Sequence, residues 1–283
     1  MHVLKDKIFC WLQYLLPQHL LSRLLSRLAD TQLPWLKNRL IIFFVRHYQV
    51  DLNEAQYSEP DHYPSFNDFF TRALKPGVRP VDLGPLTVVA AADGYLSQCG
   101  SITQGELLQA KGHLYNAAEL IGDPHLATHF GEGKFITTYL SPADYHRVHM
   151  PLAGNLTQSR YIPGKLFSVN NATTKYVPTL FTRNERLVCV FESEYGPFIM
   201  VLVGAMLVAG IESVWHGHYA PATFHKTDHS GEALSFEKGE EMGRFKFGST
   251  VILLLPNHAL IEQLPGSGAN LRMGEVIASF TDK

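Results

Sequence analysis

Residues 76–91, PGVRPVDLGPLTVVAA, divide the sequence into two parts with different hydrophobic periods. Before this stretch, apolar residues recur every three or four positions, which is the period of an amphipathic helix. Within it, Pro76, Gly77 and Pro80 interrupt any regular structure, and the apolar run Leu86–Ala91 then has the length and composition of a strand. The change of period predicts an N-terminal helical part followed by a strand-rich part.

The N-terminal part combines leucine-rich helical patterns with positive charge. Pro17 interrupts the first pattern, which predicts either two helices or one kinked helix, and Pro34 suits the start of a further helix that runs through Phe44. Residues 1–50 contain seven Lys or Arg and two Asp, a net charge of +5 in a chain whose total is −2. This pattern favours a region that lies on an anionic membrane surface, although a helical face packed against its own domain would look the same.

The rest of the chain reads as short strands separated by Gly, Pro and Asn. Two segments, 235–245 and 270–280, also align without gaps, with Gly239 over Gly274, and each has a strand–turn–strand pattern. We therefore predict an α+β fold, in which N-terminal amphipathic helices precede a mainly antiparallel β body. The expected domains are a helical, membrane-associating region at 1–80 and a β-rich catalytic domain at 81–283.

Composition excludes several classes of protein. The three cysteines form no C-x-x-C pair, so the sequence predicts neither a disulfide framework nor a cysteine-based zinc site, and a reducing cytoplasmic compartment fits best. No apolar run reaches the roughly 20 residues that a membrane-spanning helix needs. The acidic β body argues against nucleic acid as a partner.

Three parts of the β body carry residues suited to catalysis. Gly248 and Ser249 stand just before the apolar run Val251–Leu255, which is also the pattern of an ordinary turn entering a buried strand. The segment 139–151 contains two histidines, an Asp, an Arg and two tyrosines, and Asp93 follows the strand Leu86–Ala91. Together they supply a nucleophile, a base and an orienting carboxylate.

These segments resemble the signature blocks of the bacterial phosphatidylserine decarboxylases, and they occur in that family's order. The family usually writes Leu-Gly-Ser-Thr where this chain has Phe247 before Gly248, a change between two apolar residues. The matching blocks are Phe66–Arg72, Lys75–Pro80, Ala92-Asp93-Gly94, Asp144–Pro151, Pro163–Asn170 and Gly248-Ser249-Thr250.

The resemblance implies a proenzyme that cuts its own backbone between Gly248 and Ser249, giving a large chain, 1–248, and a small chain, 249–283. In this reading His149 removes the Ser249 hydroxyl proton, and Asp93 fixes the tautomer of His149 and stabilises its protonated ring. The oxygen attacks the Gly248 carbonyl, and elimination and hydrolysis then leave Ser249 as a pyruvoyl group. This covalent pyruvoyl group is the implied cofactor, and no metal is expected.

In the second stage the pyruvoyl carbonyl would form a Schiff base with the amine of phosphatidylserine, and carbon dioxide would leave to give phosphatidylethanolamine. His146 and Tyr139 are the candidates for the accompanying proton transfer. The implied partners are phosphatidylserine in an anionic membrane surface and the two chains of one precursor, with a homodimer as a candidate assembly. The implied location is peripheral, on the cytoplasmic face of the cell membrane.

Two other functions are compatible with parts of the sequence. A zinc-dependent hydrolase could use Asp144, His146 and His149, with His216 and His218 as further ligands, but the histidines lack the helical spacing of H-E-x-x-H and its general base. A non-catalytic lipid-binding module would explain the basic N-terminus and would leave the Gly-Ser and His-rich segments without a role.

Overall fold

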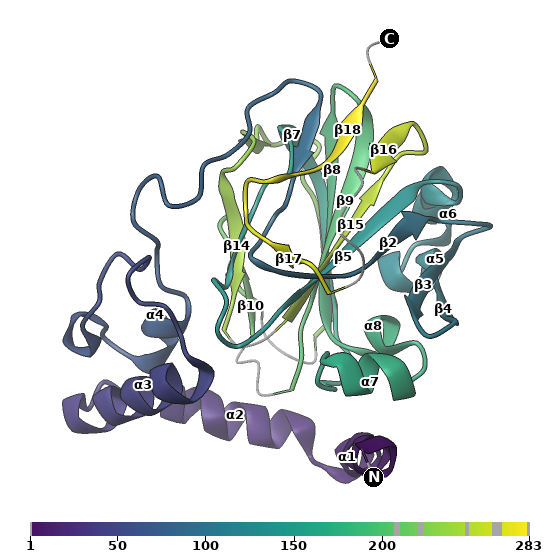
Figure 1. Cartoon of the computed structure of the whole chain (residues 1–283). Coiled ribbons are helices and arrows are strands. Elements are labelled where there is room, and N and C mark those ends of the chain that lie inside the picture. Colours follow the sequence, from purple (N-terminus) through teal and green to yellow (C-terminus); the bar gives the residue numbers. More distant parts are fainter. Residues whose placement is uncertain (1, 207–209, 220–222, 247–248, 262–267, 282–283) are drawn as a thin grey trace.

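The computed structural model describes residues 2–206, 210–219, 223–246, 249–261 and 268–281. It confirms the predicted α+β class: helices occupy the N-terminal part, and every strand pair named below is antiparallel. Figure 1 shows the N-terminal helices in a row along one side of the β body, with the linker around residue 80 leading from the helices to the β body.

Pro17 separates two helices, as one of the two alternatives predicted. Pro34 is the first residue of the next helix, where its missing N–H is not needed. That helix ends at Tyr48, and Gln49, which caps it, has a left-handed backbone with φ 55°. The N-terminal elements are α1 (His2–Leu15), α2 (Gln18–Ala29), α3 (Pro34–Tyr48), a 3-10 turn η1 (Pro60–His62) and α4 (Phe66–Phe70).

The β body is built around one nine-stranded sheet. Its strands, in spatial order, are β12 (His225–Asp228), β7 (Gly154–Ile162), β8 (Arg186–Ser193), β9 (Gly196–Val203), β15 (Ser249–Leu255), β5 (Lys134–Leu140), β2 (Gly94–Ser101) and β17 (Asn270–Leu271), with β13 (Ser235–Phe236) also paired to β7. A four-stranded sheet contains β11 (Gly217–His218), β10 (Ile211–Ser213), β14 (Glu241–Phe245) and β6 (Arg147–His149).

Smaller elements complete the body. A three-stranded sheet has the order β1 (Thr87–Val89), β18 (Val276–Phe280) and β16 (Ala259–Ile261), and β3 (Glu106–Ala110) pairs with β4 (His113–Asn116). The helical pieces are α5 (Ala117–Ile121), α6 (Pro124–Ala127), η2 (Thr128–Phe130), α7 (Asn171–Tyr176) and α8 (Leu180–Arg183).

The central strands are buried on both faces, which explains their unbroken apolar sequences. Alternate residues of β8 enter two cores, since Leu187 belongs to one and Val188 to the other. The inner core lies between the large sheet and the two smaller sheets, and includes Leu187, Cys189, Leu202, Val251, Leu253 and Phe245. The outer core lies under α5, α8 and the β3–β4 hairpin, and includes Val188, Val203, Ile252, Leu120 and Phe181.

The two aligned segments form equivalent turns, although the two strands of each segment pair with other strands, not with one another. The Gly239 amide donates to the Met150 carbonyl (2.9 Å), and the Met150 amide donates to Glu240 (2.8 Å). In the second copy the Gly274 amide donates to Ala90 (3.0 Å), and the Ala90 amide donates to Glu275 (2.8 Å). Both glycines have positive φ, 83° and 92°, which glycine adopts without strain.

The N-terminal helices dock through polar side chains and leave much apolar surface in solvent. The Gln18 side chain accepts from the Leu166 amide (2.8 Å) and donates to the Gln13 carbonyl (2.8 Å), and Gln13 in turn bonds Ser168. By contrast, large apolar side chains on these helices are 42–65% exposed, among them Leu4, Trp11, Leu15, Leu16, Leu20, Leu24, Trp35 and Phe43. No helix in the described residues is long and apolar enough to cross a membrane.

Replacing Gln18 with Ala should weaken the docking of α1 and α2, because the buried Leu166 amide and Gln13 carbonyl would lose their partner. We expect a loss of roughly 1–3 kcal/mol in the free energy of unfolding, measured by urea titration with tryptophan fluorescence. Leu24→Ala is the matched control, since Leu24 is 53% exposed on the same helix and should change stability little. Equal stability of Gln18→Ala and the parent would contradict this account of the docking.

Candidate active site

Ser249 is the first residue of β15, inside the large sheet. It pairs with Leu140 of β5, and the next residue, Thr250, pairs with Val203 of β9. The Ser249 side chain is fully buried, and its Oγ has no hydrogen-bond partner among the described residues. A buried hydroxyl without a partner costs stability and calls for a functional reason. Gly248, the other half of the predicted cleavage site, lies outside the described residues, as does Phe247.

Asp93 occupies the turn between β1 and β2 and carries a buried ion pair. Arg79 donates to both carboxylate oxygens, at 2.6–3.0 Å, and the Met273 amide donates to Oδ1 at 2.9 Å. Arg79 also donates to Glu54 (2.6 Å), and the hydrogen bonds that it donates to Asp93 raise the pKa of the Arg79 guanidinium above its ordinary value. The Asp93 carboxylate is therefore held by the Arg79 guanidinium and the Met273 amide, and it is almost completely shielded from water.

His149, on β6, is buried with both ring nitrogens engaged. Nδ1 lies 2.8 Å from the Gly239 carbonyl, and Nε2 lies 2.9 Å from the Tyr145 hydroxyl. Because a carbonyl can only accept, Nδ1 carries the proton, and Nε2 keeps the lone pair that accepts from Tyr145. Burial is the main cause that lowers the pKa of His149, so the ring is neutral at pH 7 and has the tautomer that a general base requires.

The structure brings Ser249, Asp93 and His149 to one end of the β body without direct hydrogen bonds between them in the described residues. The His149 amide donates to Ala91 (2.7 Å), two residues before Asp93, and a Cβ on Gly94 would meet the Tyr139 carbonyl beside Leu140. The sequence predicted that Asp93 sets the tautomer of His149. Instead the Gly239 carbonyl bonds Nδ1, because Arg79 and the Met273 amide already occupy the Asp93 oxygens.

His146 lies in the loop between β5 and β6 and is completely buried. Its Nδ1 bonds the Asp144 carbonyl (2.8 Å), its ring packs on Phe70 with centroids 4.1 Å apart, and Nε2 has no partner in the described part of the chain. Burial lowers its pKa to about 3, so it too is neutral at pH 7. A neutral imidazole with a free Nε2 can pass a proton to or from a reacting group.

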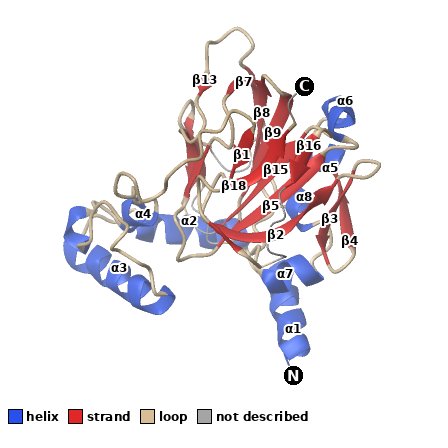
Figure 2. Cartoon of the chain, turned by 45° about the horizontal axis from the view of Figure 1, so that its top comes forward, coloured by secondary structure: helices blue, strands red, loops and turns tan. Residues whose placement is uncertain are grey.

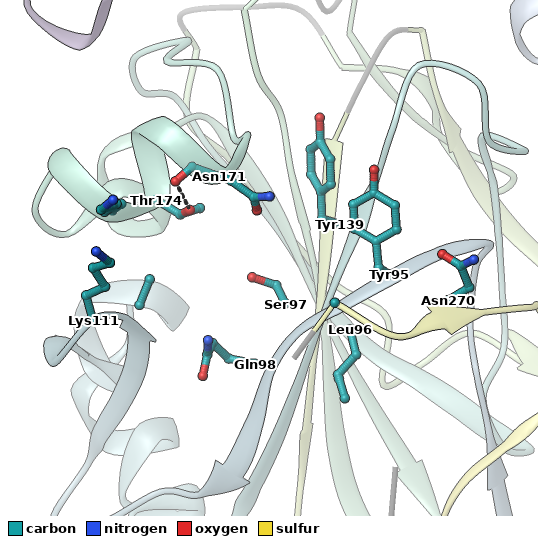
Figure 3. Close-up of a pocket in the computed structure, with 12 residues that line it drawn as sticks. Tyr95, Leu96, Ser97, Gln98, Lys111, Tyr139, Asn171, Thr174 and Asn270 are labelled. Atoms are coloured by element: carbon teal, nitrogen blue, oxygen red, sulfur yellow. Dashed lines mark hydrogen bonds between the residues drawn. The ribbon is translucent and has the colours of Figure 1, made fainter. Parts of the chain in front are cut away.

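Tyr139, which pairs with Thr250 next to Ser249, and Tyr95 line a cleft of about 510 Å³ beside the large sheet. Their rings pack with centroids 5.5 Å apart, and burial raises the pKa of Tyr139 to about 12. Figure 3 shows their hydroxyls pointing the same way, beside Asn171 of α7, while Lys111 stands across the cleft next to Thr174. Lys175 also lines the cleft, and its proximity lowers the pKa of Lys111. The cleft thus combines two ammonium groups with hydroxyl and amide donors.

The zinc alternative gains no support from the geometry. Asp144 accepts from the Ser141 amide (2.6 Å), and the His146 and His149 rings have the partners given above. His216 packs on Tyr219, with centroids 4.4 Å apart. Across the residues that the structure describes, no three His, Cys, Asp or Glu side chains, His218 included, gather in a group that could hold a metal ion.

Sequence reasoning missed the groups that hold the candidate triad. Arg79 lies in one of the matching blocks, Lys75–Pro80, but no role was predicted for it. The available signal was an arginine directly before a proline, in a chain whose predicted triad includes the carboxylate of Asp93. The Gly239 carbonyl and the Met273 amide are backbone groups, which leave no mark of their own in a sequence. They come from the two aligned segments, so each copy of the internal repeat holds one member of the site: His149 in the first and Asp93 in the second.

Comparison with known proteins identifies the family of this chain. The sequence model of the family described as "Phosphatidylserine decarboxylase" matches residues 66–279, and a second model, described as "PSD", matches residues 8–49. The chain therefore belongs to the phosphatidylserine decarboxylase family, and the prediction that it is an enzyme of this family is confirmed.

Curated relatives extend the match over nearly the whole chain. The phosphatidylserine decarboxylase proenzyme of Stutzerimonas stutzeri (strain A1501) is 52% identical over 96% of this chain and 94% of its own length. That of Pseudomonas paraeruginosa (strain PA7) is 52% identical over 97% of both chains, and that of Pseudomonas putida (strain F1) is 49% identical over 98% and 99%.

His146→Gln should reduce the pH dependence of stability in acid. The folded protein keeps His146 neutral down to about pH 3, whereas the unfolded chain takes up a proton below its ordinary pKa of 6.5, so His146 makes stability fall as pH falls from 6.5. Urea unfolding at pH 7, 6, 5 and 4 should show a slope smaller by up to about 1.4 kcal/mol per pH unit. The same change at the exposed His113 is the control, and an unchanged slope in His146→Gln would contradict the argument.

Proposed function

We propose that the enzyme decarboxylates phosphatidylserine to phosphatidylethanolamine and carbon dioxide, using a pyruvoyl group made from Ser249 by self-cleavage after Gly248. The observation that carries the proposal is the buried Ser249 Oγ, which has no partner in the described residues and starts an inner strand. A hydroxyl held away from water and from competing hydrogen bonds is suited to intramolecular attack. Its burial inside the sheet also suits a cofactor that is made from the chain itself.

In the first stage, His149 is the base and Asp93 stabilises the charge that His149 gains. The neutral Nε2 can accept the Ser249 proton once the Tyr145 hydroxyl gives way, and the Asp93 carboxylate favours the protonated ring electrostatically. The oxygen attacks the Gly248 carbonyl, the amide becomes an ester, and elimination followed by hydrolysis releases ammonia. We propose a large chain, 1–248, and a small chain, 249–283, as the products.

In the second stage, the pyruvoyl group supplies a carbonyl that accepts the substrate amine and the electrons released as carbon dioxide leaves. The chain's own residues position the headgroup and move protons. We propose that the cleft beside Tyr139 receives the headgroup, where Lys111 and Lys175 suit its phosphate and Asn171 its polar atoms. His146, neutral and with no partner for Nε2 among the described residues, and Tyr139 are the candidates to return the proton to the substrate carbon.

Intact-mass analysis of the purified protein tests the first stage. We expect two chains, 1–248 and 249–283, with the small chain blocked at its N-terminus by the pyruvoyl group and the activity sensitive to hydroxylamine. Ser249→Ala and His149→Ala should accumulate the uncut chain, and Asp93→Asn should slow cleavage while keeping an oxygen for Arg79.

A single uncut chain that decarboxylates phosphatidylserine would overturn the proposal. Loss of activity in EDTA with recovery on adding zinc would favour the metal-hydrolase alternative. Normal processing of His149→Ala would move the role of base to His146 or reject the triad.

We further propose that residues 1–80 hold the enzyme on an anionic membrane as a peripheral protein, on the cytoplasmic face, with a homodimer as a candidate assembly. The exposed leucines and aromatic residues of α1–α3 support membrane contact, because the faces that dock on the body are polar. Arg23, Arg27, Arg39 and Arg46 are exposed beside them. Lys37, another of the seven basic residues in 1–50, is buried and donates to the Pro60 carbonyl, so it does not face lipid.

Liposome flotation tests the membrane contact. Leu20→Ser combined with Leu24→Ser should reduce binding to anionic vesicles, since apolar area drives the insertion of an amphipathic helix. Replacing the four exposed arginines with Gln should weaken binding by a few contributions of roughly 1 kcal/mol each, more at low salt. Leu83→Ser, at a 75% exposed leucine of the linker, is the control and should bind as the parent does. Parental binding by both helix variants would place the contact elsewhere.

A further inference from the structure

A second buried carboxyl group lies at the same end of the large sheet. Glu185, just before β8, is only 2% exposed, and its Oε2 accepts a hydrogen bond from the Tyr161 hydroxyl at 3.0 Å. No Lys, Arg or His forms an ion pair with it in the residues that the structure describes. Burial raises its pKa to about 7, against a smaller opposing effect of the Tyr161 hydrogen bond. An unpaired buried carboxyl group is costly, and such groups concentrate at functional sites.

Sheet register places Glu185 in line with Ser249. Arg186 pairs with Val203, and Val203 pairs with Thr250, so the preceding row contains Glu185, Gly204 and Ser249. The Gly204 amide donates to the Glu185 carbonyl (2.9 Å), which continues the pairing into that row. Neighbouring strands lie about 4.8 Å apart, so Glu185 and Ser249 are separated by roughly two strand spacings.

Both side chains point into the inner core. Every second residue of a strand lies on the same face. Ser249 therefore shares a face with Val251 and Leu253, and Glu185 shares one with Leu187 and Cys189. Those four apolar or thiol side chains belong to the inner core. The partner of Glu185 agrees, because Tyr161 is also an inner-core residue. The Arg186 side chain cannot neutralise Glu185, since it turns to the opposite face and donates to the carbonyls of Leu120, Thr182 and Glu119.

Gly204 lets the carboxyl group lean toward Ser249. A Cβ at position 204 would lie 2.9 Å from both Cγ and Oε1 of Glu185. The Glu185 side chain therefore lies across the strand that separates it from Ser249, in space that any other residue would fill. Asp93 and His149 approach Ser249 from the β5 side, whereas Glu185 approaches from the β9 side, so the serine stands between two acid–base groups.

We propose that Glu185 is the acid that protonates the amide nitrogen of residue 249 during self-cleavage. This rests on the proposed function, and it gives the reaction a second proton-transfer group. Oγ loses its proton to His149 and forms a bond to the Gly248 carbonyl carbon. The bond from that carbon to the nitrogen of residue 249 breaks, the nitrogen takes the Glu185 proton and leaves as an amine, and Glu185 regains a proton from protonated His149 through solvent or the site.

Glu185→Gln tests the proposal, because the amide keeps the shape and the oxygen that accepts from Tyr161 but cannot donate a carboxyl proton. The full-length chain is made by cell-free translation and chased at pH 5.5–9, with the cut fraction measured by electrophoresis. We expect cleavage roughly 100-fold slower or more, a typical loss for a general acid. In the parent the rate should fall above pH 7 as Glu185 loses its proton, and the variant should lack that decline. Other titratable groups on that side, among the described residues, are Tyr161, its hydrogen-bond donor, Tyr219, stacked on Tyr161, and Cys189 of β8.

Two controls separate this role from a structural one. Glu192→Gln changes an exposed carboxyl group on the same strand and should cleave as the parent does. In a Ser249→Ala background, Glu185→Gln should leave the urea midpoint unchanged. Parental cleavage in Glu185→Gln, or slow cleavage that keeps the parental pH profile, would overturn the inference alone. A parent chain that stays whole would overturn the proposed function and this inference with it.

Discussion

The ion pair between Arg79 and Asp93 is the contact on which the arrangement of the site depends. Arg79 belongs to the linker, bonds Glu54 in the helical part and grips Asp93 in the β body, so one guanidinium joins both regions. Removing one partner of such a buried pair typically costs 3–5 kcal/mol. The residues that follow Arg79 fit against both repeated turns: Val81 contacts Gly239, and the Pro80 carbonyl lies where a side chain on Gly274 would be. The linker thereby fixes the turns that hold His149 and Asp93.

Much of the fold could be predicted because it follows from the hydrophobic period. Strands buried on both faces, such as β9 and β15, require unbroken apolar runs, and the helical leucine pattern and Pro17 set α1 and α2. The face on which these helices dock could not be predicted, because the buried stripe is polar. Gln13, Gln18 and Ser22 are inside while the leucines are outside, the reverse of the usual amphipathic arrangement. Hydrogen bonds to residues 164, 166 and 168 favour that choice.

The side chains of the site could be predicted from the sequence, but the hydrogen bonds that hold them could not. Ser249, Asp93, His149 and His146 could be singled out because hydroxyl, carboxyl and imidazole groups are visible in a sequence. Their hydrogen-bond partners include backbone groups of residues 144, 239 and 273, which any residue type could supply. Glu185 could not be predicted for a related reason: only the register of three strands, together with the missing side chain at Gly204, places it in the same row as Ser249.

The arrangement of the helices and the cleft bears on how a lipid reaches the site. Helix α1 packs against α7 (Figure 2). Asn171 and Lys175 of α7 line the cleft, and Lys7 of α1 lies over the Tyr176 ring. The cleft therefore opens beside the helices whose apolar side chains face solvent. If those side chains enter a bilayer, the headgroup of a lipid in the same leaflet meets the cleft while its acyl chains stay in the membrane. The exposed leucines would then keep the enzyme at the bilayer, and the buried, neutral acid–base groups would carry out the proton transfers away from water. Both features suit a substrate that stays in the bilayer during the reaction.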